Sequence, residues 1–275
     1  MRAYATTDVG RVRRVNQDYI FCSMMPVGKL PNLFIVADGM GGHKAGDLAS
    51  RFTVETLINN IKNSSSDNPI TIINDAIVNA NTLLLEKAAE SEDYEGMGTT
   101  LVVCTIIGES MYVANVGDSR LYLYDGKLSQ ITRDHSLVEE MVALGKLNRD
   151  EARTHKRKNV ITRAIGGGKE VMADFFEAEL TAGNRIIMCS DGLSNMVDDG
   201  EIEQILSLNL PIEDKAKRLI DMANESGGAD KFLTTLRIST YLLSGVNPGL
   251  NSSITALAPS FLGSFCITPG RTVAI

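Results

Sequence analysis

Short apolar runs, each bounded by Gly, Asp or Asn, recur along the first 190 residues and predict β-strands. The main ones are rich in Val, Ile, Leu or Tyr and cover residues 33–37, 100–107, 111–116, 120–124 and 185–190. Gly117-Asp118-Ser119 reads as a tight turn between two of these strands, and Asp125-Gly126 leads into a further strand at 127–131. Residues 111–131 are therefore predicted to form a β-meander.

Longer segments with apolar residues three to four positions apart predict helices. They cover residues 46–62, 69–91, 136–144 and 211–226. The second is the clearest, with Ile73, Ile77, Ala80 and Leu84 on one face. Strands gather in clusters and helices in pairs, which favours an α+β layered sandwich over a doubly wound parallel sheet.

Composition narrows the class of protein. The chain has 275 residues, 44% of them hydrophobic, which is enough for one large domain or two fused halves. Its net charge of -7 argues against a nucleic-acid binder and suits a protein that gathers divalent cations. The four cysteines include no CxxC pair, the N-terminus has no apolar signal core, and no apolar run reaches the ~20 residues of a membrane span. We therefore expect a cytoplasmic protein in a reducing setting.

Several aspartates stand where an apolar strand ends and Gly or Ser follows. They are Asp38 before Gly39, Asp118 before Ser119, and Asp191 before Gly192, while Asp18 lies near the start and Asp230 lies late. Hard cations such as Mg²⁺ and Mn²⁺ prefer oxygen ligands, and strand ends hold carboxylates rigidly. A single Asp-Gly is more often only a turn, as we expect for Asp125-Gly126. The residues alone indicate a candidate metal site.

Eight short motifs, in order from about Thr6 to Asp230, resemble those of the type 2C metal-dependent Ser/Thr protein phosphatases, the PPM family, in its compact bacterial form. The motifs are GRVRRVNQD, VADGMGGHKAGD, GMGTTL, ANVGDSRLYLY, TRDHSLVEEMV, TRAIGG, MCSDGLSNMV and GGAD. The resemblance implies a four-layer α-β-β-α sandwich of two antiparallel sheets flanked by helix pairs. It also implies two Mn²⁺ or Mg²⁺ ions, with a third, weaker site near a lid at about residues 140–165.

The resemblance assigns a role to each matching residue. Asp38 would bridge both cations, and the carbonyl of Gly39 would bind the second. Asp191 and Asp230 would complete the first site. Asp18 would support the second, directly or through water, and Asp118 with Asp191 would serve the third. Arg13 would grip the substrate phosphate with its planar guanidinium.

The implied reaction is hydrolysis of phosphoserine or phosphothreonine by a hydroxide that bridges the two cations. His43 is a candidate proton donor to the leaving oxygen, or only a loop histidine packed on the turn, and the residues leave both open. Asp134-His135-Ser136 reads as structural. The expected partners are phosphoproteins, including a Ser/Thr kinase and its substrates, with no nucleic acid or membrane, and we expect a monomer.

Residues 145–158 are polar and basic, which fits either a solvated surface segment or a mobile lid that receives an anionic substrate. The end of the chain departs from the family pattern. Lys231 stands where Asn is expected, and all 34 acidic residues lie within 1–230. We therefore divide the chain into a phosphatase domain, 1–238, and an atypical tail, 239–275. The tail fits a genuine divergent C-terminus, a frameshift-like sequence or a short anchor.

Three functions remain open at this stage. The first is a phosphoserine/phosphothreonine phosphatase, favoured by the five aspartates. The second is a catalytically impaired pseudophosphatase that acts as a regulatory module, for which the tail is the only argument. The third is another two-metal hydrolase, such as a phosphodiesterase, against which the order of the motifs argues.

Overall fold

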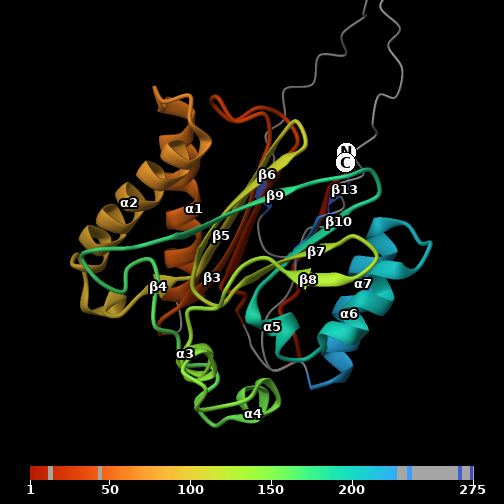
Figure 1. The fold of residues 1–275 in the computed structure, drawn as a ribbon. Coiled ribbons are helices and arrows are strands. Elements are labelled where there is room, and N and C mark those ends of the chain that lie inside the picture. The colour runs from red at the N-terminus through yellow and green to blue at the C-terminus, as the bar shows by residue number, and fades with distance from the viewer. Residues whose placement is uncertain (12–14, 43–44, 228–233, 237–265, 268–272, 275) are drawn as a thin grey trace, which may run out of the picture.

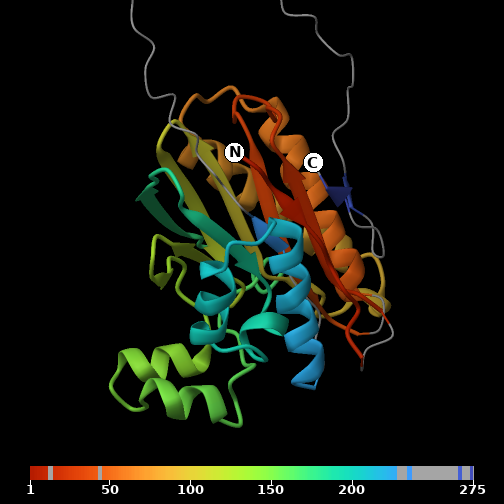
Figure 2. The same cartoon turned by 90° about the vertical axis from the view of Figure 1, so that its right-hand side faces the viewer.

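The computed structural model describes residues 1–11, 15–42, 45–227, 234–236, 266–267 and 273–274. Two antiparallel sheets face each other, with one pair of long helices outside the first sheet and two helices outside the second (Figure 1). This four-layer arrangement confirms the predicted α+β sandwich. Two further helices stand apart from the sandwich at one end (Figure 2).

The first sheet has the strand order β12-β2-β3-β5-β6-β9, with β4 paired to β3. Its strands are β2 (Asp18–Ser23), β3 (Leu33–Met40), β4 (Gly98–Thr99), β5 (Leu101–Ile107), β6 (Ser110–Val116), β9 (Asp174–Glu179) and β12 (Cys266–Ile267). The second sheet has the order β11-β10-β7-β8. Its strands are β7 (Arg120–Tyr124), β8 (Leu128–Gln130), β10 (Arg185–Cys189) and β11 (Thr234–Leu236). A separate pair joins β1 (Tyr4–Ala5) to β13 (Val273–Ala274).

The helices divide between the two outer layers and the end of the sandwich. They are α1 (Ala45–Asn63), α2 (Pro69–Ala88), α3 (Leu137–Ala143), α4 (Arg149–Thr154), α5 (Asp191–Ser194), α6 (Asp199–Ser207), α7 (Ile212–Glu225) and the 3₁₀ turn η1 (Glu92–Tyr94). Sequence signals explain how α2 starts: Asn68 accepts a hydrogen bond from the Thr71 amide at 3.0 Å, and Pro69 occupies the first turn. No helix in the described part of the chain is both long and apolar enough to cross a bilayer.

Three apolar cores hold the four layers together, and strand alternation explains how the first sheet serves two of them. On β2, Tyr19 and Phe21 pack in the core beneath α1 and α2. Ile20 and Cys22, on the other face, pack in the core between the sheets. The third core lies between the second sheet and α5–α7, and includes Leu193.

The predicted meander is wrong at its first turn. Strand β6 pairs with β5 and β9, whereas β7 pairs with β10 and β8, so residues 117–119 cross from one sheet to the other. Gly117 has φ +110°, and a Cβ there would lie 2.6 Å from the Thr100 Cγ2 atom, so only glycine fits. The second turn, Asp125-Gly126, does join β7 to β8 as predicted.

The other predicted strands and helices are present, with ends shifted by up to three residues. Elements that the pattern did not reveal include β1, β2, β4, β9, α4, α5 and α6. The polar segment 145–158 contains α4, whose start is closed by reciprocal bonds between Asn148 and Glu151. Most of the tail, 239–275, lies outside the described residues, apart from β12 and β13.

Candidate active site

Asp18 and Asp38 lie side by side where two neighbouring strands meet the end of the sandwich that carries α3–α5. They are directly paired residues of the antiparallel β2–β3 ladder. The Ser190 hydroxyl, at the end of β10 in the other sheet, donates a hydrogen bond to Asp18 Oδ2 at 2.9 Å. This bond joins the two sheets at the site.

The backbone of Asp38 is fixed by two threonines at the start of the neighbouring strand. Its amide donates to Thr100 Oγ1 at 3.0 Å, and its carbonyl accepts from the Thr100 amide and from Thr99 Oγ1, both at 2.9 Å. The Thr100 and Ser119 hydroxyls are 2.8 Å apart. The same threonine therefore anchors Asp38 and the link that carries Asp118.

Asp118 and Asp191 complete the group of carboxylates. Asp118 lies in the link between the sheets, and Asp191 opens α5 directly after β10. Asn195, one turn later, donates to Asp191 Oδ2 at 3.0 Å. Asp38, Gly39, Asp118 and Asp191 all line one cavity of about 310 Å³. Strand ends far apart in the sequence thus bring these residues together.

The electrostatics of this cavity are those of crowded, buried carboxylates. Burial raises the pKa of Asp38 well above its ordinary value, and the nearby carboxylates of Asp18 and Asp191 add to the rise. The pKa of Asp118 is also raised, first by burial and then by the charge of Asp191. A bound cation favours the charged form of such carboxylates, so these residues fit a divalent metal.

Gly39 is required by close backbone packing. A Cβ at this position would lie 1.9 Å from the carbonyl oxygen of Gly46 in the first turn of α1. Its amide donates to the carbonyl of Gln17 at 3.0 Å. Gly39 therefore lets the backbone of α1 approach closely beside Asp38.

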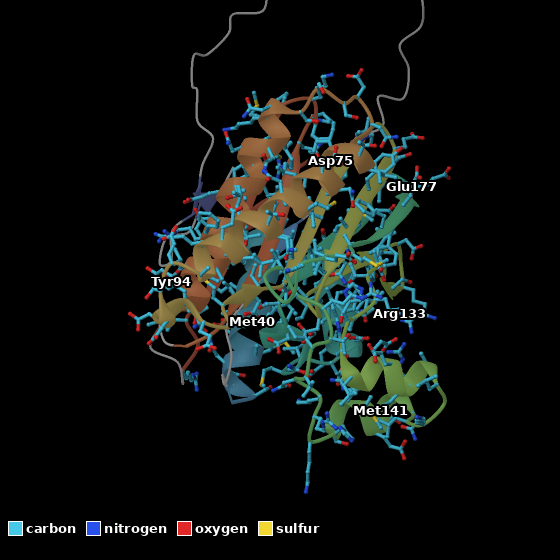
Figure 3. The ribbon with its side chains drawn as sticks, turned by 90° about the vertical axis from the view of Figure 1, so that its left-hand side faces the viewer. Met40, Asp75, Tyr94, Arg133, Met141 and Glu177 are labelled. Carbon is cyan, nitrogen blue, oxygen red and sulfur yellow. The ribbon has the colours of Figure 1, made fainter. Side chains whose placement is uncertain are left out.

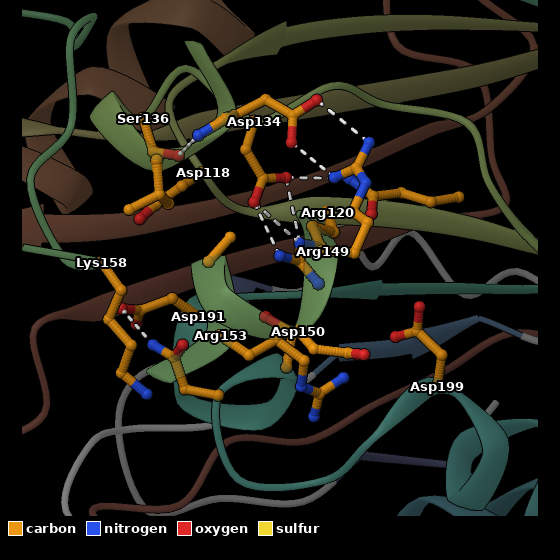
Figure 4. Close-up of a pocket in the computed structure, with 16 residues that line it drawn as sticks. Asp118, Arg120, Asp134, Ser136, Arg149, Asp150, Arg153, Lys158, Asp191 and Asp199 are labelled. Atoms are coloured by element: carbon orange, nitrogen blue, oxygen red, sulfur yellow. Dashed lines mark hydrogen bonds and ion pairs between the residues drawn. The ribbon is translucent and has the colours of Figure 1, made fainter. Parts of the chain in front are cut away.

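A second cavity, of about 460 Å³, opens between the carboxylates and the lid formed by α3 and α4. Asp118 and Asp191 line it on one side (Figure 4). Arg149, Arg153 and Lys158 of the lid line it on the other. Arg149 pairs with Glu139 of α3, which ties the two lid helices together. The basic lid residues therefore face a space that adjoins the carboxylates.

Three residues named from the sequence, Arg13, His43 and Asp230, lie outside the described residues. Within the described ranges, no three His, Cys, Asp or Glu side chains form a complete metal cluster by themselves. Mg²⁺ and Mn²⁺ are commonly held by a few carboxylates and several water molecules. Carboxylates that do not form a tight cluster are therefore still compatible with binding of these cations.

His135 is a buried residue that the sequence marked only as structural. Its backbone amide donates to the Gly117 carbonyl at 2.9 Å, and its Nδ1 accepts from the Gly117 amide at 3.1 Å. Its Nε2 lies 3.0 Å from Asp174 Oδ2 on β9. Through its two hydrogen bonds to Gly117, His135 fixes the link at residues 117–119 that carries Asp118. Thr99, Thr100, Ser119, Ser190 and Asn195 also support the site, and the motifs GMGTTL, NVGDS and MCSDGLSN contained them without revealing their roles.

Comparison with known proteins agrees with this geometry. The family model "Protein phosphatase 2C" matches residues 10–237. Protein phosphatase PhpP of Streptococcus pneumoniae is 37% identical over 237 residues, which cover 84% of this chain and 94% of the relative. The structure of the S. agalactiae serine/threonine phosphatase superposes with a TM-score of 0.76 at 36% identity, over 84% of this chain and 96% of that one.

A further solved structure is that of the catalytic domain of the serine/threonine protein phosphatase PstP, in complex with two manganese ions. It superposes with a TM-score of 0.74 at 33% identity, over 84% of this chain and 95% of that one. The matches span both sheets and every described carboxylate of the site. The chain belongs to the protein phosphatase 2C family, as its motifs indicated.

Proposed function

We propose that this protein hydrolyses phosphoserine and phosphothreonine in other proteins, with Mn²⁺ or Mg²⁺ as cofactor. The observation that carries the proposal is the convergence of Asp18, Asp38, Asp118 and Asp191 at one end of a family-typical sandwich. The names of the relatives, which are serine/threonine phosphatases, support the same activity. None of them supports a pseudophosphatase or regulatory module.

The carboxylates have distinct tasks in this proposal. Asp38 serves both main cations, Asp191 and Asp230 complete the first site, and Asp18 with the Gly39 carbonyl supports the second. Asp118 and Asp191 serve a third, weaker site that faces the lid. Bound cations neutralise the phosphoryl oxygens and lower the pKa of a coordinated water, which provides the nucleophile near neutral pH.

Arg13 and His43 are proposed to act on the substrate itself. The guanidinium of Arg13 matches two phosphate oxygens in both ground and transition states. Arg13→Ala is therefore expected to raise KM more than it lowers kcat in steady-state kinetics on a phosphopeptide. A pure loss of kcat with unchanged KM would contradict this role. His43 is proposed to protonate the leaving serine or threonine oxygen.

The decisive experiment is release of phosphate from a phosphothreonine peptide with Mn²⁺, with Mg²⁺, and with EDTA as control. We expect activity with either cation and none with EDTA. A diester substrate, bis(p-nitrophenyl) phosphate, tests the phosphodiesterase alternative in the same assay. Peptide hydrolysis that persists in EDTA, or a preference for the diester, would overturn the proposal.

The biological setting is proposed on the same basis. The substrates are phosphoproteins, among them a Ser/Thr kinase and the proteins that it modifies. We place the enzyme in the cytoplasm as a signalling monomer that binds neither nucleic acid nor membrane, in line with its acidic charge of -7.

A further inference from the structure

A groove of about 490 Å³ adjoins the carboxylate cavity. Met40 and Ile161 line both the groove and the carboxylate cavity, so the two spaces are direct neighbours. Met40 follows Gly39 at the end of β3, and Figure 3 shows it toward the lid end of the sandwich. A chain whose phosphate reaches Asp38 can therefore continue into this groove.

The groove has an apolar and adaptable lining. Its apolar side chains are Met40, Ile161, Ala164, Val171 and Met172, and the rest of the lining is Thr162, Arg163, Gly167, Gly168 and Glu170. The Met172 side chain is 72% exposed, among the most exposed large apolar residues in the described part of the chain. Exposed apolar side chains that gather beside a site mark binding surfaces, and methionine adapts its shape to different apolar partners.

The wall of the groove is held in place by a buried polar side chain. Asn81 of α2, which is 1% exposed, accepts from the Gly166 amide at 2.8 Å and donates to the Gly168 carbonyl at 3.0 Å. The preceding residue, Ile165, exchanges two backbone hydrogen bonds with Thr99, at 2.9 and 3.0 Å. A ligand would therefore meet a preorganised surface and lose little affinity to ordering it.

The charges around the groove disfavour an acidic ligand. Arg163 also lines the groove, but its guanidinium pairs with Asp174 at 2.8 Å, which weakens its attraction for an acidic ligand. Glu170 lies on the rim, is exposed, and has no hydrogen bond or ion pair with any other described residue. An acidic side chain in the groove would meet this carboxylate, whereas an apolar one would be buried against the methionines.

We infer that this groove is a substrate subsite that binds an apolar, non-acidic side chain flanking the phosphorylated residue. The inference rests on the proposed phosphatase function and adds a sequence preference to it. The lid cavity, which Arg149, Arg153 and Lys158 line together with acidic residues such as Asp150, also adjoins the carboxylates. A substrate can therefore meet different side chains in the two spaces.

The test compares kcat/KM for two phosphothreonine peptides that are identical except for their flanking residues, Leu in one and Glu in the other. We expect the full-length protein to prefer the Leu peptide by roughly tenfold, the discrimination that one apolar pocket gives. Met172→Glu should reduce this ratio at least fivefold. Met172→Ala should lower it less and in the same direction.

The matched control is Met25→Glu, because Met25 is 66% exposed and lies beyond the end of β2 opposite to Asp18. It should keep the wild-type ratio, and melting temperatures check that all variants fold. An unchanged ratio in Met172→Glu, or an equal loss in Met25→Glu, overturns the inference. Hydrolysis of p-nitrophenyl phosphate by the wild type separates the two proposals, since failure of that Mn²⁺-dependent reaction overturns the phosphatase function as well.

Discussion

At the scale of single residues, the carboxylate of Asp38 is proposed to bind metal, but it lowers the stability of the metal-free protein. Its carboxylate is buried beside Asp18, and like charges without a cation repel one another. We expect Asp38→Asn and Asp191→Asn each to abolish Mn²⁺-dependent phosphopeptide hydrolysis. Without metal, each variant should be at least as stable as the wild type, because the substitution removes one of several crowded carboxylates. Phosphate release and thermal unfolding in EDTA measure the two effects.

Asp125→Asn is the matched control for these two variants. Asp125 also precedes a glycine at the end of a strand, but it lies in the exposed β7–β8 turn. Its substitution should leave activity and stability close to wild type. Near-wild-type turnover of Asp38→Asn at saturating Mn²⁺ would show that the metal assignment is wrong.

Three of the four cysteines provide a second prediction at this scale. Cys22, Cys104 and Cys189 are free and buried. Burial raises the pKa of Cys22 to about 12 and that of Cys189 to about 12, and it raises the pKa of Cys104 as well. The thiolate is the reactive form, so these thiols stay protonated and inert at pH 8.

Iodoacetamide at pH 8, followed by peptide mapping, should leave these three cysteines unlabelled in the native protein. All three should react once guanidinium unfolds the chain. Rapid labelling of Cys22 or Cys189 in the folded protein would contradict the buried placement of the side chain.

The sequence identifies a candidate site residue when the residues next to it in the chain mark its structural position. An aspartate and a glycine after an apolar run identify Asp38 as a strand-end carboxylate. Thr100, Ser119 and Ser190 escape this reasoning because their value lies in partners distant in sequence. Ser190, for example, supports Asp18 through a hydrogen bond across 172 positions. Serine and threonine are too common for such a role to be read locally.

At the scale of elements, the root of the lid is coupled to the link between the sheets. Ser136 and Ile161, at the two ends of the lid, form an isolated bridge, and the Thr162 amide donates to the His135 carbonyl at 2.8 Å. His135 also bonds twice to Gly117, next to Asp118. One residue therefore fixes the base of the lid and the position of a proposed metal ligand.

We expect His135→Ala to lower the free energy of unfolding by about 1–3 kcal/mol, since it leaves a buried amide without its acceptor. It should also lower activity, because the Asp118 link loosens. Urea unfolding and phosphopeptide kinetics test both effects. His155→Ala is the control, since the His155 ring accepts only an exposed bond from the Arg157 amide. Equal stability of the two variants would show that the hydrogen bonds of His135 to Gly117 do not stabilise the fold.

The failed prediction at this scale has a clear cause. Local turn residues make 117–119 look like a hairpin, but pairing is decided by which strands bury their faces together. Both edges of strand β6 are already paired, with β5 and β9 in the first sheet. The chain therefore cannot pair back on β6 after Val116 and continues into the second sheet. Strand β9 was missed for a related reason, because its acidic, half-buried sequence DFFEAE lacks an apolar run.

At the scale of the whole molecule, the four layers give the site its position. Both sheets end at the carboxylates, so each contributes residues: Asp18 and Asp38 come from the first sheet, and Asp191 follows the second. The clustering of strands and the pairing of helices along the chain predicted the sandwich class. The meeting of the two sheets at one cavity could not be predicted from the pattern, since it depends on how the sheets face each other.

The described parts of the tail, which spans residues 239–275, contribute little to the four-layer sandwich. The family match ends at residue 237, directly after β11, which completes the edge of the second sheet beside β10. Beyond it, the described parts of the tail are β12 on β2 and β13 on β1, each only two residues long. A few such hydrogen bonds contribute roughly 1 kcal/mol each, which the sandwich can lose.

We therefore expect a chain that ends at Ile238 to keep its fold and its activity, because β11 remains. The truncated chain should unfold within about 2 kcal/mol of the full one and be at least as soluble, since residues 239–275 are rich in apolar residues and carry no acidic side chain. Lys231→Asn in the full chain should raise Mn²⁺-dependent activity, because it removes a positive charge one position after the proposed metal ligand Asp230 and restores the residue expected from the family pattern. Sedimentation, urea unfolding and phosphopeptide kinetics on the three proteins make the comparison. If truncation instead unfolds the protein or removes its activity, β12 and β13 are integral to the sandwich, and the tail belongs to the phosphatase domain.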